Sequence, residues 1–396
     1  FGILFFVHAI GISGLAWGVV FGGILHLAIQ LPSFFMSGFR YKKIVNFAHQ
    51  GVVRVIKLMI PRSLGLAASQ VNIIVVTAIA STLASGSIAV FSLANNIVFL
   101  LLGLIALPFS AAVFPVLSLK FSENDRSYFI EKFSSTFRHI LFLMVPLSFL
   151  FFTLRNQIVG VIFGSGRFGL VDSQLVAACL GLFSLGIFAQ GLVLLISKTF
   201  FAAQNTKTPA IASIVSVILN IILSFLFVGL LKFPNVFQRS MANLFGLGDL
   251  TSIEIVGLPL ALSLSAIFQL FLLLFLLHKA IGNFRLKEIL SSFGKIILAS
   301  FLMVVFVYPA IRLIPFYLNL NVQIFSGIFW QTIMSLIIGL GVYLGSSYLL
   351  GSPEIKIVKR LISGLVLSSS NGPALSSSNG LAGTQTKADL KNNDSA

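Results

Sequence analysis

Ten polar side chains lie within or at the ends of long apolar segments, and they are the residues with which this chain could do chemistry. A polar group in hydrocarbon is costly unless it is paired, faces water or meets a ligand. We therefore expect some of them to hold helices together and others to line a hydrated cavity. The candidates for such a cavity are Arg62, Ser69, Gln70, Asn72, Asn95, Asn96, Gln190, Lys198, Asn220 and Gln269.

The charges within this set are positive. Arg62 and Lys198 stand near the ends of their segments, and none of the ten acidic residues of the chain lies inside an apolar segment. This distribution disfavours a carboxylate-driven proton pump or a cation antiporter and favours an anionic solute. A second interpretation stays open, in which both side chains reach the phosphate head groups of the bilayer.

Motifs typical of enzymes are missing. The chain contains no Walker A sequence, no Rossmann glycine pattern and no HExxH sequence, and its five histidines are scattered. The single Cys179 lies in an apolar segment, which excludes a disulfide framework and a Cys-rich metal site. We therefore predict a protein that is not an enzyme and has no cofactor.

The elements that carry the polar residues are long and continuously apolar. The chain of 396 residues is 57% hydrophobic and 9% charged, with a mean hydropathy of +1.05. A helix of roughly 20 residues crosses the hydrocarbon core, whereas a transmembrane barrel would show short alternating segments. We predict an all-α, polytopic membrane protein of about nine spans, centred near Gly18, Ile73, Leu102, Leu147, Leu185, Leu219, Ser265, Val304 and Leu336.

The basic residues predict the orientation. When the gaps between spans are assigned to alternate sides, 21 Lys and Arg fall on one side and five on the other. The positive-inside rule places the richer side in the cytoplasm. The first span then enters from outside, and the C-terminus is cytoplasmic. The net charge of +16 comes from basic residues in the gaps between spans, where the positive-inside rule explains them. We therefore do not expect nucleic acid as a partner.

Several separated motifs occur in the order found in the MurJ/MviN family of lipid II flippases, within the multidrug/oligosaccharidyl-lipid/polysaccharide exporter superfamily, and the chain resembles that family. The most specific match is the turn Gln204-Asn205-Thr206-Lys207-Thr208-Pro209 after Phe200-Phe201-Ala202-Ala203. The other matching motifs are residues 15–23 with 30–32, residues 57–62 with 69–72, residues 80–87 and residues 114–118.

The resemblance implies a fourteen-span protein of which these nine are spans six to fourteen, so that the sequence is N-terminally truncated. It implies that residues 1–35 are the last span of an N-terminal bundle, 36–57 a cytoplasmic amphipathic linker, 58–281 a C-terminal six-helix bundle and 290–350 two extra spans. The Ser/Asn/Gly-rich residues 363–396 are predicted to be a disordered tail. We expect the first span to end at Pro32 and the second span to start at Pro61.

The function implied by the resemblance is the flipping of undecaprenyl-diphosphate-linked peptidoglycan precursor (lipid II) by alternating access. The protein would be a monomer in the bacterial cytoplasmic membrane. In the family, the last two spans form a hydrophobic groove for the lipid tail. Three alternatives stay open: a flippase for another lipid-linked oligosaccharide, a drug or ion antiporter of the same superfamily, and a non-transporting membrane scaffold.

Two positions depart from the family pattern. The family often has Asp-Arg where this chain has Asn95 and Asn96, so the cavity loses a charge there. Some relatives carry an acidic sodium ligand where this chain has Val76. Asn220 and Ser224 could keep part of a degraded sodium site, and no other metal site is predicted.

Overall fold

The structure is a computed structural model. It describes Phe6 and residues 10–11, 13–38, 49–164, 169–248, 252–318 and 324–355. The chain divides into two compact units, Phe1–Lys57 and Leu58–Ala396.

The first unit contains helix α2 (Ser13–Met36) and the first turns of α3 (Gln50–Ser81). Almost every described side chain of α2 is exposed, from Leu15 to Met36. The expectation that this span ends at Pro32 is wrong, because Pro32 lies inside α2. Pro61 likewise lies inside α3 instead of at its start. Helices in membranes tolerate proline where neighbouring groups and local adjustments satisfy the freed backbone atoms.

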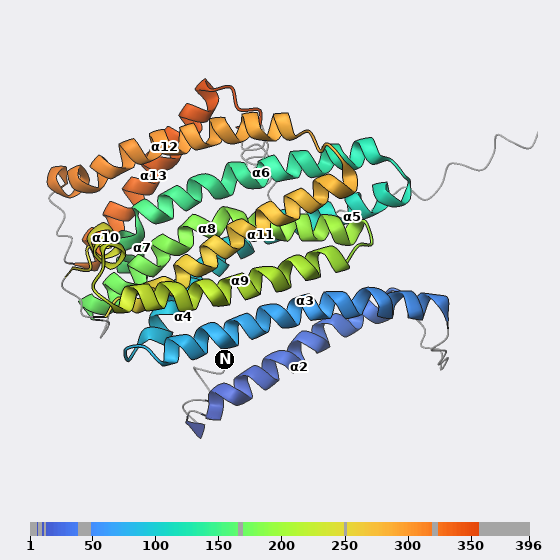
Figure 1. The fold of residues 1–396 in the computed structure, drawn as a ribbon, viewed down its shortest axis with the longest axis horizontal. Coiled ribbons are helices and arrows are strands. Elements are labelled where there is room, and N and C mark those ends of the chain that lie inside the picture. The colour runs from blue at the N-terminus through green and yellow to red at the C-terminus, as the bar shows by residue number, and fades with distance from the viewer. Residues whose placement is uncertain are drawn as a thin grey trace, which may run out of the picture. The chain divides into compact units, whose positions relative to one another are not determined.

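The second unit is a helical bundle whose long helices run side by side in Figure 1. After α3, its helices are α4 (Ser87–Leu101), the π-helical turn η2 (Leu102–Ala106), α5 (Leu107–Ser122), α6 (Arg126–Thr153), α7 (Arg155–Phe163), α8 (Leu170–Ala202), α9 (Lys207–Lys232), α10 (Val236–Phe245), the 3₁₀ turn η3 (Glu254–Val256), α11 (Gly257–Ile281), α12 (Leu286–Tyr317) and α13 (Phe325–Leu349).

Helix α8 is the centre of this bundle. It is the most buried of the long helices and packs against α4, α5, α6, α7 and α11. Its glycines permit this close packing. An added methyl group on Gly186 would lie 2.7 Å from the Cα atom of Ser263 in α11, and one on Gly191 would lie 3.2 Å from Met144 in α6. Phe183 of α8 and Phe142 of α6 are fully buried aromatic side chains of this core.

Helices α4 and α5 form one continuous span through the π-helical turn η2. The backbone N–H of Leu107 donates to the carbonyl oxygen of Leu102, which is a spacing of five residues. Such a turn accommodates one residue more than a regular helix and often marks a functional site. Gly103 lies in this turn, with no atom within 4 Å of the position of a Cβ.

Helices α12 and α13 pack on each other and on the bundle at several points. The Tyr343 hydroxyl of α13 donates to the Phe142 carbonyl of α6 at 2.6 Å. At the end near the α5–α6 turn, Glu354 is only 3% exposed and accepts a hydrogen bond of 2.8 Å from the Ser292 hydroxyl of α12. The same carboxylate lies 3.8 Å from Arg138 of α6, so it joins three parts of the bundle.

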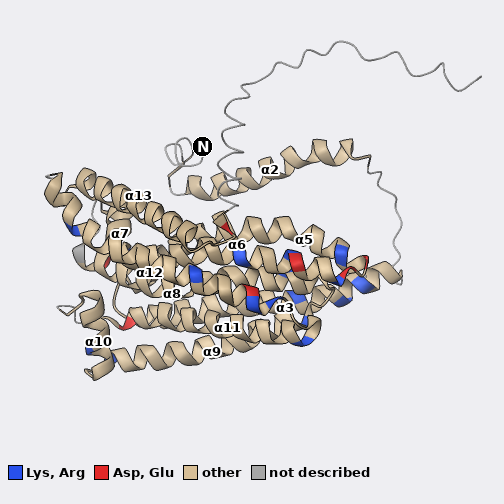
Figure 2. Ribbon diagram, turned by 90° about the horizontal axis from the view of Figure 1, so that it is seen from above, with Lys and Arg blue, Asp and Glu red and all other residues tan. Residues whose placement is uncertain are grey.

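The predicted fold class is confirmed. The described residues contain nine helices that are long and apolar enough to cross a membrane, and no strand. Figure 2 shows most charged positions of the second unit toward the end where α5 turns into α6. Of the predicted linker 36–57, residues 39–48 lie outside the described part, and residues from Gln50 onward belong to α3. The predicted tail 363–396 also lies outside the described residues.

Candidate functional site

Two adjoining, open pockets of the second unit carry a few polar side chains on largely apolar walls, and we call them together the polar cavity. One has a volume of about 290 Å³ and lies between α3, α8, α9 and α11. The other has a volume of about 410 Å³ and lies between α4, η2, α5, α8 and α11. Both are lined by Val193, Leu194 and Gln269, so the two pockets are neighbours along α8 and α11.

The smaller pocket contains a positive charge and several hydroxyl groups, and we call it the Arg62 pocket. The guanidinium carbon of Arg62 lies 5.3 Å from the centre of the Phe201 ring. Four hydroxyl-bearing residues also line the pocket: Ser69, Ser197, Thr206 and Ser213. No carboxylate lines it among the described residues. A guanidinium stacked on an aromatic ring keeps its planar donors available for an anion.

The larger pocket is neutral, and we call it the glutamine pocket. Gln190 of α8 and Gln269 of α11 line it, and its remaining wall is apolar: Phe99, Leu102, Gly103, Leu107, Val193, Leu194 and Ala266. Both glutamines are half-buried. Gly103, in the π-helical turn, contributes backbone to this wall without a side chain.

The predicted motif turn forms part of the cavity wall. Gln204 adopts a left-handed backbone conformation, with φ of 58°. The Asn205 side-chain oxygen accepts from the Thr208 backbone N–H at 3.1 Å, and its amide donates to the Thr208 hydroxyl at 2.9 Å. These two bonds hold the start of α9 at Lys207, which brings Thr206 and Pro209 into the Arg62 pocket.

Asn72 and Asn220 meet outside these pockets. The Asn220 amide of α9 donates to the Asn72 side-chain oxygen of α3 at 2.6 Å. Asn220 is 1% exposed, and its own side-chain oxygen and the buried Ser224 hydroxyl have no hydrogen-bond partner among the described residues. That Asn220 and Ser224 keep part of a degraded sodium site stays a prediction from the sequence. No group of three His, Cys, Asp or Glu surrounds a common point in the described part of the chain.

The structure brings together only some of the predicted cavity residues. Arg62, Ser69, Gln190 and Gln269 line the two pockets. Gln70, Asn95, Asn96 and Lys198 line neither pocket, and Gln70 and Asn96 are exposed.

Sequence reasoning missed Ser197, Phe201 and Ser213 as wall residues. The sequence could have indicated two of them, because Ser197 and Phe201 are four residues apart and therefore share one face of a helix. Ser213 lies six residues after the start of α9, and no comparable signal pointed to it.

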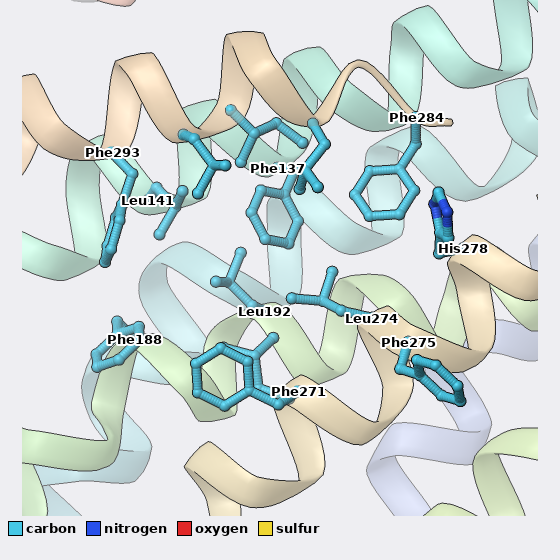
Figure 3. Close-up of a pocket in the computed structure, with 14 residues that line it drawn as sticks. Phe137, Leu141, Phe188, Leu192, Phe271, Leu274, Phe275, His278, Phe284 and Phe293 are labelled. Atoms are coloured by element: carbon cyan, nitrogen blue, oxygen red, sulfur yellow. The ribbon is translucent and has the colours of Figure 1, made fainter. Parts of the chain in front are cut away.

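A separate apolar pocket of about 380 Å³ lies between α6, α8, α11 and α12. Figure 3 shows Phe137, Phe293, Leu192, Phe271 and the ring of His278 around this space. All its other lining residues are apolar, and His278 is the single polar side chain in its wall. Such a surface suits a hydrocarbon chain.

Comparisons with known proteins agree on one family. The model of the family described as "Lipid II flippase MurJ" matches residues 1–326. A probable lipid II flippase MurJ of Buchnera aphidicola subsp. Schizaphis graminum is 28% identical over 305 residues, which cover 77% of this chain and 55% of that protein. One of Bdellovibrio bacteriovorus is 24% identical over 356 residues, which cover 90% of this chain and 62% of that protein.

A solved structure, "Lipid II flippase MurJ, inward closed conformation", is similar to this chain with a TM-score of 0.62 and 26% sequence identity. The match covers 87% of this chain and 63% of that one. The chain thus spans less than two thirds of the length of each of these relatives. The resemblance seen in the ordered motifs is confirmed, and the chain belongs to the MurJ lipid II flippase family.

Proposed function

We propose that the protein moves a lipid-linked, diphosphate-bearing peptidoglycan precursor (lipid II) across the bacterial cytoplasmic membrane. The observation that carries this proposal is a pocket between apolar helices of a MurJ-family chain that is lined by an arginine and by no carboxylate among the described residues. A charged side chain between membrane-spanning helices is a candidate for part of a substrate pathway.

Arg62 is the residue that would meet the diphosphate. A guanidinium binds phosphate oxygens through two parallel hydrogen bonds, and these are stronger than bonds between neutral groups. No described acidic residue forms an ion pair with Arg62, so its charge is available to an incoming anion. Lys198, which lines neither pocket, would add to the positive potential at this end of the bundle without touching the substrate.

The lipid tail would lie on apolar surface near α12. The pocket beside α12 is lined by phenylalanine and leucine from four helices and can hold a segment of a hydrocarbon chain. The head group would then occupy the polar cavity while the tail stays in hydrocarbon. The charged head group would thus avoid the cost of entering hydrocarbon without polar partners.

Alternating access requires the cavity walls to move. The π-helical turn at Gly103 and the following Pro108 interrupt regular hydrogen bonding in the α4–α5 span. Such positions absorb changes in backbone angles more easily than a regular helix. They lie beside the glutamine pocket, where a movement of this span would change its width.

We propose that the α5–α6 turn and the C-terminus lie in the cytoplasm, which the excess of basic residues on that side supports. Arg62 lies in the half of α3 that begins at Gln50, after the basic stretch on that same side, so the Arg62 pocket would be the cytoplasmic entrance. We also propose that the protein works as a monomer.

Lipid binding to the full chain tests the proposal. Native mass spectrometry should show lipid II bound more tightly than a lipid-linked oligosaccharide with another glycan, and the full chain in liposomes should flip lipid II. Preference for the other glycan would indicate a different flippase, and drug or ion exchange without lipid binding would indicate an antiporter. A protein that binds neither lipid and transports nothing would be a scaffold.

A further inference from the structure

Two glutamine side chains line the same pocket without a hydrogen-bond partner among the described residues. Gln190 of α8 and Gln269 of α11 line the glutamine pocket, and neither forms a hydrogen bond to another described residue. An amide that is half-buried among membrane helices loses water and gains nothing in return unless something else bonds to it. Two such amides facing one space therefore require an explanation.

Other amides of the bundle show how this chain uses such groups when their role is structural. Asn220 donates to Asn72 at 2.6 Å, and Gln331 donates to the Ile311 carbonyl at 2.7 Å. Asn205 bonds to the first residues of α9. These three amides have partners from the protein itself, whereas Gln190 and Gln269 have none among the described residues.

The wall around the two amides narrows the chemistry of a ligand. Apart from the glutamines, the lining of this pocket is apolar and carries no charge. A side-chain amide both donates and accepts hydrogen bonds, which suits hydroxyl, acetamido and peptide groups. The volume of about 410 Å³ lies within the range of about 300–1,000 Å³ that is usual for ligand pockets.

The neighbouring pocket supplies the complementary chemistry. Arg62 lies in the wall of the Arg62 pocket, and Gln269 borders both pockets. A ligand with an anionic part joined to a neutral polar part could place the first beside Arg62 and the second between the glutamines. A head group in which a diphosphate is linked to an amide-bearing sugar has this arrangement.

We infer that Gln190 and Gln269 determine specificity by binding the neutral sugar or peptide part of the head group, while Arg62 binds the diphosphate. This inference rests on the proposed function and divides its site into two parts. Arg62 alone would accept any polyprenyl diphosphate, because a charge attracts phosphate irrespective of what the phosphate carries. The two amides would add the preference for the glycan-bearing lipid.

The experiment compares two lipids on the full chain by native mass spectrometry: lipid II, and undecaprenyl diphosphate, which lacks the sugar and peptide. The variants are Gln190→Met and Gln269→Met, which keep the side-chain length and remove the amide. Gln174→Met is the matched control, because Gln174 lies on the same helix α8, is exposed and lines neither pocket.

Each cavity variant should weaken lipid II binding about three- to tenfold, as expected for one lost neutral hydrogen bond, and leave undecaprenyl diphosphate binding within about twofold. Arg62→Gln should weaken both lipids by a similar factor, and Gln174→Met should change neither. Unchanged binding in the cavity variants, or an equal loss for both lipids, overturns the inference while the proposed function stands. A wild-type chain that binds neither lipid overturns both.

Thermal unfolding separates binding from folding. The Met variants should unfold within about 2 °C of the wild type, because no described hydrogen bond is lost. A large drop in the unfolding temperature of both Met variants, with lipid preference intact, would assign the glutamines to helix packing and overturn the inference.

Discussion

The side-chain amide of Asn220 donates a hydrogen bond of 2.6 Å to the side-chain oxygen of Asn72, 148 residues away along the chain. This bond joins α9 to α3 among apolar side chains, where either amide alone would lack a partner. Alanine at both positions should reveal a coupling of about 0.6–1.7 kcal/mol in a double-mutant cycle of unfolding in detergent. Additive effects of the two substitutions would show that the bond contributes nothing.

The exposed Asn156 of α7 is the control for this cycle, because it has no described hydrogen bond. Asn156→Ala combined with Asn72→Ala should show no coupling, since the two residues share no partner.

Arg62→Gln should reduce binding of undecaprenyl diphosphate at least tenfold, and the salt dependence of that binding should fall, because a charge beside the phosphates is lost. Arg62→Lys should recover only part of the affinity, since an ammonium cannot make the paired bonds of a guanidinium. Binding measured at two salt concentrations checks this. Arg239→Gln, on the exposed side of α10, is the matched control; an equal loss there would make the effect of Arg62 non-specific.

Gly186→Ala should destabilise the protein by about 1–3 kcal/mol, because the new methyl group would lie 2.7 Å from the Ser263 Cα atom, which cannot move aside. Gly341→Ala on α13 meets no atom within 4 Å and should be neutral or stabilising by up to about 1 kcal/mol. The unfolding temperature should therefore fall for Gly186→Ala and stay the same or rise for Gly341→Ala. A shift of equal size and sign would contradict the close approach of α8 and α11.

Glu354→Ala should cost about 3–5 kcal/mol, because the buried carboxylate serves both Ser292 and Arg138 and its loss leaves Arg138 less compensated. Glu288→Ala removes another partner of Arg138, at 3.5 Å, but this carboxylate is 46% exposed. It should cost at most about 1 kcal/mol. Denaturation of both variants checks the contrast, and equal losses would show that burial of Glu354 is unimportant.

Cysteine labelling checks the orientation. The native Cys179 is fully buried and should not react, so any labelling comes from the introduced cysteine. In intact cells, a membrane-impermeant maleimide should label Ser85→Cys, in the α3–α4 turn, and not Ser122→Cys at the end of α5. Both positions are exposed, so both should react once the membrane is permeabilised. The reverse labelling would place the C-terminus outside.

The fold was largely predictable, because membrane spans depend on long-range averages of hydrophobicity that a sequence displays directly. Boundaries were less accessible. Pro32 and Pro61 suggested helix ends, yet both lie inside helices, since membrane helices accept proline when their other turns are intact.

The site was predictable in residue type but not in partnership. The sequence shows that Asn72 and Gln269 are polar residues in apolar surroundings, but both look alike. Only the packing distinguishes them, because Asn72 meets Asn220 and Gln269 meets the cavity. Glu354 is a similar case: it follows the last span, where an exposed acid is the usual expectation, and the structure buries it.

The π-helical turn at residues 102–106 also has an evolutionary meaning. Such a turn holds one residue more than the corresponding turn of an α-helix, as one inserted residue would produce. In an α-helix, one residue corresponds to a rotation of about 100°, so an uncompensated insertion would turn the whole of α5 away from α8. Confining the extra residue to Leu102–Ala106 keeps both flanking helices in phase with their neighbours. Relatives with a regular helix here should be one residue shorter between Leu101 and Leu107, and that gap should anchor the alignment of this span.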